Sequence, residues 1–328
     1  MTSLRLSRPP AVVVTMALLA LVAFALSLAI GPDGFGLPKD EAAARLVFYE
    51  IRVPRALLGF LVGAALGLSG AVLQGYLRNA LAEPGLLGIS GGAALGAVIA
   101  IHTGIAGRMA LSLPLAGLAG AAVASIAIAA LAGTGSSATT LVLAGVAISS
   151  VAGALTSLAL NLSPNPFAST EIMFWLMGSL TDRSLAHVWL AAPLILVGVA
   201  MLLTTGRDLE ALSLGEDAAQ NLGVDPAGLR FKVIAGTALA VGAATAVSGA
   251  ISFIGLIIPH LLRPWVADSP GRLLVPSLFG GAALVLMSDV ALRLFSPQGD
   301  LRLGVLSALL GAPFFLRLVL QKRGDLAR

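Results

Sequence analysis

A serine motif is the first feature of this 328-residue chain that could do chemistry. The stretch GISGG, residues 88–92, matches the glycine–serine–glycine patterns around the nucleophiles of α/β hydrolases and intramembrane serine proteases. Such a serine needs a histidine base within hydrogen-bond reach, and His260 is the one plausible partner inside an apolar run. Because the chain contains 38 glycines, so short a pattern is expected by chance. We therefore predict no catalytic residue.

Metal and nucleotide chemistry lack the residues that they would need. His102 and His187 lie near the ends of two other apolar runs, and three scattered histidines without any cysteine form no metal-binding pattern. The nucleotide-binding pattern G-x-x-x-x-G-K-[ST] does not occur, and the chain has no Gly-Lys dipeptide. We expect no metal and no cofactor in this chain, so any ATP that drives it must be bound by a partner subunit.

Three arginines and one aspartate in or beside apolar runs are the remaining candidates. Asp289 lies within LVLMSDVALRLF, and Arg293 follows four residues later on the same helix face. An intramembrane carboxylate is a functional candidate, but an ion pair that fixes the rotation of the helix accounts for it better. Arg52 and Arg55, in IRVPR, lie at the mouth of another run. If Arg293 faces outward, the three arginines could bind carboxylates of a partner, and topology anchoring is the alternative.

The elements that must position these residues are predicted to be membrane-spanning helices. The chain is 58% hydrophobic and 11% charged, and apolar runs near 20 residues recur along it. A helix of roughly 20 apolar residues crosses a bilayer core, whereas open sheets cannot satisfy their backbone groups in lipid. We predict an all-α polytopic membrane protein with one domain over residues 1–328. Its net charge of +4 fits arginines that set topology and contact lipid, so we expect no nucleic-acid partner.

Ten spans are predicted, and both termini then lie on one side of the membrane. The spans cover residues 11–30, 56–76, 84–103, 111–132, 139–160, 185–205, 229–249, 251–267, 273–294 and 302–320. The first follows Arg5 and Arg8 and is too long for the apolar region of a signal peptide, so we expect it to remain uncleaved. The basic C-terminal QKRGDLAR suits the cytoplasm, although the excess of Lys and Arg on that side is weak.

Two similarities within the chain suggest an internal repeat. GAALGLSGAVLQG (63–75) resembles GAATAVSGAISFIG (242–255), and GGAAL occurs at both 91–95 and 280–284. The predicted topology sends spans 2–5 and spans 7–10 through the membrane in opposite directions. Inverted repeats of this kind are typical of transporters, with the pathway at the repeat interface. Chance similarity between glycine- and alanine-rich helices is the alternative.

Two connecting segments have their own helix signals. Residues 163–184 are predicted to be external and to contain a short helix. Within residues 206–228, SLGEDAAQNLGVDP has the capping-box spacing at Ser213 and Glu216, and Gly223 and Pro226 end the helix. A helix lying on the membrane surface should be basic, and this one is acidic. We therefore expect it to contact a protein partner in the cytoplasm.

Several stretches together resemble a known family along essentially the whole chain. They are IRVPRALLGFLVGAALGLSGAVLQGYLRNALAEPGLLGISGGAALG (51–96), LVLAGVAIS (141–149), FWLMGSL (174–180), LSLGEDAAQNLGV (212–224), ISFIGLIIPHLLR (251–263) and LGVLSALLGAPFFLRLVL (303–320). The chain resembles the FecCD/BtuC-type permease subunits of type II ABC importers for iron–siderophore complexes, haem and cobalamin. A stand-alone secondary transporter or channel is the alternative from another class.

The resemblance implies partners, a location and a substrate class. It implies a second permease copy, as a homodimer or a homologous heterodimer, and two ATPase subunits that bind ATP and Mg²⁺. It further implies a substrate-binding protein outside and a metal chelate as substrate, with ferric siderophore as the first expectation. The expected location is a bacterial inner (plasma) membrane, with both termini in the cytoplasm.

The resemblance also assigns roles to individual residues. The residues expected to couple to the ATPase are Ser213, Leu214, Gly215, Glu216, Leu222 and Gly223. Those expected to dock the binding protein are Arg52, Arg55 and Arg293. A cytoplasmic gate is expected at Asn79, Leu81, Thr139 and Thr140, an external gate near residues 160–177, and a family motif in span 8 at Gly255, Pro259 and His260. Ala80 departs from the proline usual in this family, which puts the exact gate geometry in doubt.

Overall fold

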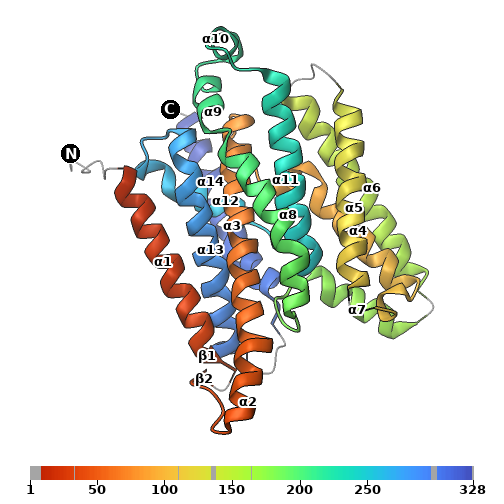
Figure 1. The fold of residues 1–328 in the computed structure, drawn as a ribbon. Coiled ribbons are helices and arrows are strands. Elements are labelled where there is room, and N and C mark those ends of the chain that lie inside the picture. The colour runs from red at the N-terminus through yellow and green to blue at the C-terminus, as the bar shows by residue number, and fades with distance from the viewer. Residues whose placement is uncertain are drawn as a thin grey trace.

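The protein is a bundle of long helices in the computed structural model, which describes residues 9–32, 34–109, 111–133, 138–163, 165–296 and 301–326 (Figure 1). The first elements are α1 (Pro9–Ala29), β1 (Ile30–Gly31), β2 (Gly34–Phe35), α2 (Glu41–Leu46), the π-helix η1 (Val47–Arg52), α3 (Val53–Tyr76), the 3₁₀ turn η2 (Pro84–Leu87), α4 (Ile89–His102), η3 (Ile105–Gly107), α5 (Ser112–Ala132), α6 (Ala138–Asn161) and α7 (Pro166–Leu176). The remaining elements are α8 (Leu185–Leu203), α9 (Gly206–Leu212), α10 (Glu216–Asn221), α11 (Pro226–Ser248), α12 (Ile254–Leu262), η4 (Arg263–Trp265), α13 (Pro270–Phe295) and α14 (Leu303–Leu326).

Within the part of the chain that the structure describes, seven helical stretches are long and apolar enough to cross a membrane. They are Pro10–Ala29, Glu41–Tyr76, Ser112–Ala132, Ala138–Asn161, Leu185–Leu203, Pro226–Ser248 and Pro270–Phe295. The other three predicted spans correspond to α4, α12 and the apolar Leu303–Leu318 part of α14. The prediction of an all-α polytopic membrane protein is confirmed. Helices α4 and α12 are shorter than predicted, with 14 and 9 residues.

Both short helices begin where a residue with positive φ interrupts the regular helical backbone. Gly88 precedes α4 with a φ of 74°, and Phe253 precedes α12 with a φ of 69°. Glycine adopts this left-handed conformation freely, whereas phenylalanine there is strained by about 1–3 kcal/mol. Irregular backbone at membrane depth is tolerated where protein buries it, and interrupted helices in corresponding positions of two repeats are typical of transporters.

The structure supports the predicted inverted repeat for one of the two sequence similarities. Helices α3 and α11 run in opposite directions through the bundle (Figure 1). Gly63 of α3 packs against Gly281 of α13, and its counterpart Gly242 of α11 packs against Ala121 of α5. The first pair joins spans 2 and 9, and the second joins spans 7 and 4, as the repeat requires. The two GGAAL copies lie in α4 and α13, which are not equivalent helices, so that similarity is not part of the repeat.

Close backbone contacts hold the central helix α3 in place. A Cβ atom on Gly70 would lie 2.0 Å from the carbonyl oxygen of Gly255 in α12, so only glycine permits this crossing. Lipid provides no hydrophobic drive for helix association, and such small-residue contacts increase van der Waals packing instead. Of an apolar 18-residue portion of the stretch that contains α3, 83% is buried, whereas the corresponding share is 22% in α1 and 22% in α6. The bundle is therefore built around α3, and α1 and α6 lie at its periphery.

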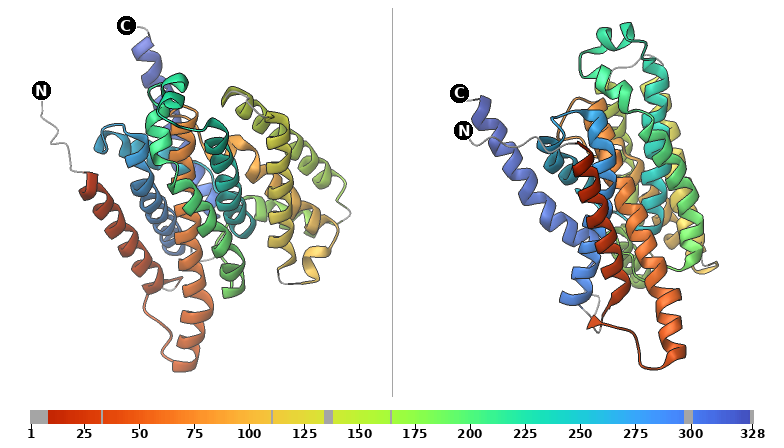
Figure 2. Two further views of the ribbon diagram at one scale, coloured as in Figure 1. Left: turned by 45° about the horizontal axis from the view of Figure 1, so that its top comes forward. Right: turned by 60° about the vertical axis from the view of Figure 1, so that its left-hand side comes forward.

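The connecting segments gather at two opposite ends of the bundle. Helices α9 and α10 lie at one end, and α2 lies at the other together with the antiparallel pair β1–β2 (Figure 1). The start of α1 and the end of α14 are on the α10 side (Figure 2). Within the predicted external segment 163–184, the structure shows the short helix α7 (Pro166–Leu176), whose N-cap Asn165 accepts a hydrogen bond from the backbone N–H of Phe167.

Candidate functional site

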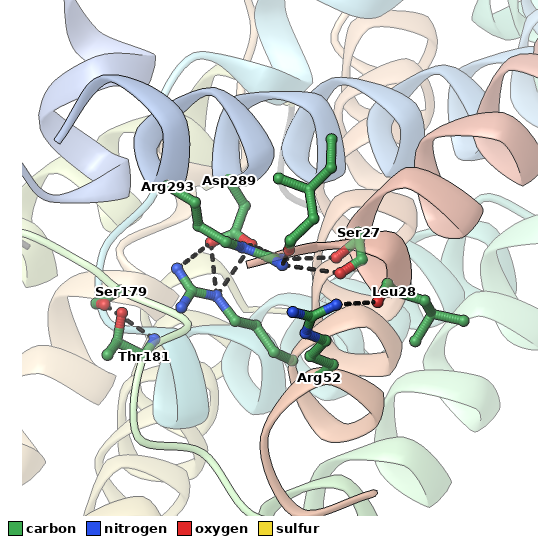
Figure 3. A network of polar contacts seen from close by, with 9 residues as sticks. Ser27, Leu28, Arg52, Ser179, Thr181, Asp289 and Arg293 are labelled. Atoms are coloured by element: carbon green, nitrogen blue, oxygen red, sulfur yellow. Dashed lines mark hydrogen bonds and ion pairs between the residues drawn. The ribbon is translucent and has the colours of Figure 1, made fainter. Parts of the chain in front are cut away.

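Asp289 of α13 joins α3 to α13 through two arginines (Figure 3). Arg55 of α3 donates from Nε to both carboxylate oxygens, at 3.1 and 3.0 Å, and from Nη2 to Oδ1 at 2.8 Å. Arg293 of α13 donates from Nε to Oδ2 at 3.1 Å and forms an ion pair through Nη2. The Asp289 side chain is 1% exposed, and two guanidinium groups offset its charge. The predicted ion pair with Arg293 is confirmed, and Arg55 is a second partner that was not predicted.

Arg293 also holds the C-terminal end of α1. Its Nη1 donates to the carbonyl oxygens of Ser27 at 2.8 Å and Ile30 at 2.7 Å, and its Nη2 donates to Ser27 Oγ at 2.7 Å (Figure 3). The side chain is 4% exposed. Arg293 therefore does not face outward in this structure, because its donors are used to close the end of a neighbouring helix.

Arg52 also binds the C-terminal end of α1, together with the residue that follows β2. Its Nη1 donates to the carbonyl oxygen of Leu28 at 2.9 Å (Figure 3). The same Nη1 donates to the carbonyl oxygen of Ala29 at 2.9 Å, and Nη2 donates to that of Gly36 at 2.5 Å. The last carbonyl groups of a helix lack partners within the helix, and Arg52 supplies donors to those of Leu28 and Ala29, the latter of which also accepts from the backbone N–H of Gly36 at 3.1 Å. Arg52 is therefore buried as a structural brace, at 6% exposure.

Arg55 is the most accessible of the three predicted docking arginines. Its side chain is 14% exposed and lines two cavities of about 200 and 390 Å³ at the α2 end. Ser179, Thr181 and Ser296 line the smaller cavity beside it. The three arginines lie close together as predicted, but Arg52 and Arg293 are occupied by the protein's own carbonyl groups. Their docking role stays a prediction.

At the opposite end, Asn79 and Leu81 lie in the turn after α3, residues 77–82. The backbone N–H of Asn79 donates to the carbonyl oxygen of Gln74 at 3.1 Å, and Asn79 Oδ1 accepts from the N–H of Leu81 at 3.0 Å. The N–H of Ala82 closes the turn on the carbonyl oxygen of Asn79 at 3.1 Å. Asn79 thus organises this turn although alanine replaces proline at position 80.

The start of α6 lies close to this turn. A cavity of about 70 Å³ is lined by Tyr76 at the end of α3, Ala138 at the start of α6, and Glu216 and Ala219 of α10. Thr139 and Thr140 are the next residues of α6, the first exposed and the second half-buried. The end of α3 and the start of α6, which adjoin the two parts of the predicted cytoplasmic gate, therefore line one cavity with α10 of the predicted coupling segment.

The segment 206–228 contains two short helices rather than one capped helix. Ser213 ends α9, where its Oγ donates to the carbonyl oxygen of Glu210 at 2.6 Å. Gly215, with φ 112°, is the N-cap of α10, and Gly223, with φ 88°, follows its end. The predicted capping box at Ser213 is wrong because the turn of α9 uses that hydroxyl group. The predicted glycine stop is confirmed.

Apolar and acidic side chains are exposed together on this segment. Leu214 and Leu222 flank α10 and are 69% and 65% exposed, whereas Ala219 is buried beneath it. Glu216 and Asp217 occupy the first turn, where the helix dipole favours carboxylates. Two exposed leucines beside two carboxylates at a loop tip favour contact with a protein that has an apolar pocket and basic groups.

The serine and histidine considered for catalysis have different neighbours. Thr245 Oγ1 donates to Ser90 Oγ at 3.3 Å, while the His260 ring packs edge-to-face on Phe314, with centroids 5.6 Å apart. Gly255 and Pro259, the other residues of the predicted family motif, are buried in α12. This motif serves the close packing of α12 on α3. Among the described residues, no group of three or more His, Cys, Asp or Glu could hold a metal ion.

The sequence analysis missed two polar residues in the bundle, the buried Gln74 and the half-buried Glu83. Gln74 of α3 donates from Nε2 to the carbonyl oxygen of Gly255 at 3.2 Å and accepts from Arg263 Nη2 at 2.9 Å. Glu83 precedes η2, and its burial raises the pKa of its carboxyl group, while a hydrogen bond from the backbone N–H of Phe253 opposes the rise. A glutamine inside an apolar run was a visible signal for the first. The second had no signal, because Phe253 lies far away in the sequence.

Another cavity contains none of the predicted site residues. It is an apolar groove of about 1060 Å³ between α5 and α11, with Leu194 of α8 at its wall. Its lining consists of alanines and larger aliphatic residues, with Phe231 and Arg230 on α11. The predicted gate and docking residues all lie elsewhere, at the two ends of the bundle.

Known proteins similar to this chain cover nearly all of it. The model of the FecCD transport family matches residues 11–321. The vitamin B12 import system permease protein BtuC of Salmonella typhimurium is 38% identical over 94% of this chain and 94% of its own length. An uncharacterized ABC transporter permease protein, YvrB of Bacillus subtilis, is 35% identical over 89% of this chain and 84% of its own length.

A solved structure supports the same assignment. It shows an inward-facing conformation of a putative metal-chelate type ABC transporter and superposes with a TM-score of 0.86, at 32% identity, over 95% of this chain and 99% of that chain. The agreement includes the helical bundle in which the predicted docking, gate and coupling residues are placed. The chain is therefore a member of the FecCD transport family, a polytopic permease subunit of the ABC-transporter type.

Proposed function

We propose that this chain is the membrane-spanning subunit of a type II ABC importer that moves a metal chelate across a bacterial inner membrane. The observation that carries the proposal is the α9–α10 segment, which exposes Leu214 and Leu222 beside two carboxylates at one end of the bundle. Because the chain has no nucleotide-binding motif, this segment is where a separate ATPase would deliver the energy of ATP.

The proposal also implies the orientation of the chain in the membrane and the position of each partner. The α10 end is cytoplasmic, so both termini are cytoplasmic, and two ATPase subunits bind ATP and Mg²⁺ there. A substrate-binding protein docks at the α2 end. A second permease copy covers part of the apolar surface of α6, in which Leu143 and Leu155 are exposed, and lipid covers the rest. The pathway would then run between the two copies.

The mechanism uses the inverted repeat. When the ATPases close, movement of α10 changes the arrangement of α3 and α6 at the cytoplasmic gate formed by Asn79, Leu81, Thr139 and Thr140. At the other end, α7 and the end of α6 form the external gate. Alternating access of this kind needs rigid helices joined by irregular backbone. The irregular residues before α4 and α12 provide such joints.

Docking of the binding protein is proposed to involve Arg55 first. A carboxylate from the partner would meet Arg55 in the cavities at the α2 end, because Arg52 and Arg293 are already engaged with backbone carbonyl groups. The latter two support the surface and would contact the partner only after their network rearranges. Weaker binding of the cognate binding protein to Arg55→Ala, with unchanged binding to an Arg108→Ala control, would support this role.

The coupling role of α10 is tested by assembly. The chain is co-purified with its cognate ATPase, as wild type and as Glu216→Ala/Leu222→Ala. We expect the double variant to lose most of the bound ATPase and of the ATP-dependent uptake, since it removes a charge and a large apolar contact. A double variant with intact assembly and uptake would show that α10 is not the coupling element.

Ferric siderophore remains the first substrate to test, and cobalamin is the second because several relatives are vitamin B12 import permeases. The cognate binding protein is titrated with ferrichrome, haemin and cyanocobalamin, and the bound chelate is then offered to the reconstituted importer. Tight binding and uptake of one chelate would assign the substrate. Binding of cyanocobalamin alone would overturn the siderophore expectation.

A further inference from the structure

The cytoplasmic segment is attached to the bundle unevenly. Helix α9 is fixed to the start of α13, because Ser269 Oγ donates to Glu210 Oε1 at 2.5 Å. Helix α10 lies between Gly215 and Gly223, two glycines with positive φ around which nothing lies within 4 Å of a Cβ position. Such glycines act as hinges, because backbone rotation there meets no side chain. Helix α10 can therefore move relative to α9.

One ion pair connects α10 to the rest of the bundle. Arg78 Nη2 lies 3.2 Å from Glu216 Oε1, although the two residues are 138 positions apart. Among the described residues, this is the one side-chain hydrogen bond or ion pair that any residue of α10 makes outside its own segment. Below it, Ala219 closes the cavity of about 70 Å³ that Tyr76 and Ala138 also line.

Arg78 belongs to the turn that holds the predicted gate. It directly precedes Asn79 and has a φ of 49°, which an arginine adopts only when its surroundings hold it there. The backbone N–H of Arg78 donates to the carbonyl oxygen of Gly75 at 3.3 Å, and the next residues are tied together by the hydrogen bonds of Asn79. A displacement of the Arg78 side chain therefore acts on the 77–82 turn as a unit.

We propose that the Arg78–Glu216 ion pair transmits the movement of α10 to the 77–82 turn, so that Arg78 is a positioning residue of the cytoplasmic gate. This inference rests on the proposed function, since it requires an ATPase that moves α10. Both side chains are about half exposed, at 49% and 60%, so the pair adds little to stability. Its importance is mechanical, because it links the hinged helix α10 to the 77–82 turn of the same chain.

A cysteine reporter tests the link without knowledge of the substrate. The chain contains no cysteine, and Ala80, half-buried in the turn, is replaced by cysteine. The complex with its ATPase is labelled with a maleimide in the absence of nucleotide and with ATP and orthovanadate. In this parent we expect nucleotide to change the labelling rate. Arg78→Glu should reduce that change about two- to five-fold, the size expected of an exposed ion pair, and Arg78→Lys should retain most of it.

A second ion pair of the same kind provides the matched control. Lys232 Nζ and Asp208 Oδ2 are 3.4 Å apart and also partly exposed, but they join α11 to α9 and do not reach the turn. Lys232→Glu should leave the nucleotide response of the reporter unchanged. An Arg78→Glu response equal to that of the parent, an equal loss in Lys232→Glu, or a parent without any response would overturn the link. Failure of the parent to bind the ATPase would instead overturn the proposed function.

Discussion

Asp289 shows how one charge can organise the end of a helical bundle. Its carboxylate lies between Arg55 of α3 and Arg293 of α13, and Arg293 continues to the end of α1. A buried carboxylate is costly unless it is paired and hydrogen-bonded, and here both guanidinium groups pair with it and donate hydrogen bonds to it. The residue is therefore a structural junction, and the arginines around it are held in fixed positions.

Removal of this carboxylate should destabilise the protein strongly. Asp289→Ala leaves two buried guanidinium groups without their anion, and we expect a loss of about 3–5 kcal/mol in the free energy of unfolding. Thermal unfolding of the detergent-solubilised chain measures the effect. Glu50→Ala, which removes an exposed carboxylate at the same end, should change stability by no more than about 0.5 kcal/mol. Equal unfolding temperatures for the two variants would contradict the role of Asp289.

Glu83 should make stability depend on pH. Its pKa is raised above the ordinary value of 4.5 by burial, so the folded chain binds this proton more tightly than the unfolded chain does. The contribution of Glu83 to stability is therefore fully present below pH 4.5 and is lost as the pH rises through the raised pKa. Unfolding temperatures between pH 4 and 8 should fall less in Glu83→Gln than in the wild type. Identical profiles would show that Glu83 is not responsible.

At the level of elements, the crossing of α3 and α12 depends on backbone contact. Gly70→Ala would place a Cβ atom 2.0 Å from the carbonyl oxygen of Gly255, and the two helices would have to separate. We expect a loss of roughly 1–3 kcal/mol in unfolding experiments. Gly153→Ala in α6 is the matched control, because nothing lies within 4 Å of its Cβ position and alanine favours helix there. A neutral Gly70→Ala would mean that the helices are not in contact.

Hydropathy and local signals predicted the long helices, α10 and its terminal glycine, because these depend on neighbouring residues. The short α12 was not predicted: its apolar sequence reads as a full span, and the break at Phe253 depends on packing by other helices. Ser213 was misassigned because a hydroxyl can cap the helix after it or bond to the turn before it. The contacts of Arg78 and Arg55 join residues 138 and 234 positions apart, which no local pattern shows.

At the level of the whole molecule, one chain presents two surfaces that need partners. Helices α5 and α6 are only 28% and 22% buried, and the α10 end exposes leucines beside carboxylates. Lipid can cover the helices, but it cannot cover an acidic loop tip. Under the proposed function, the ATPase would cover this tip on the cytoplasmic side.

The assembly should contain two copies of the chain. Native mass spectrometry of the purified complex should show two chains of 33.0 kDa with two copies of the ATPase, because a pathway between inverted-repeat bundles closes around a two-fold axis. Complexes that contain a single permease chain with full transport activity would contradict this stoichiometry.

Transport in proteoliposomes tests the central claim most directly. The chain is reconstituted with and without its ATPase, and uptake of the chelate bound by the cognate binding protein is measured with ATP inside and all ion gradients collapsed. The account predicts uptake that requires both ATP and the ATPase and that persists without any gradient. Uptake by the chain alone, driven by an ion gradient and indifferent to ATP, would contradict it.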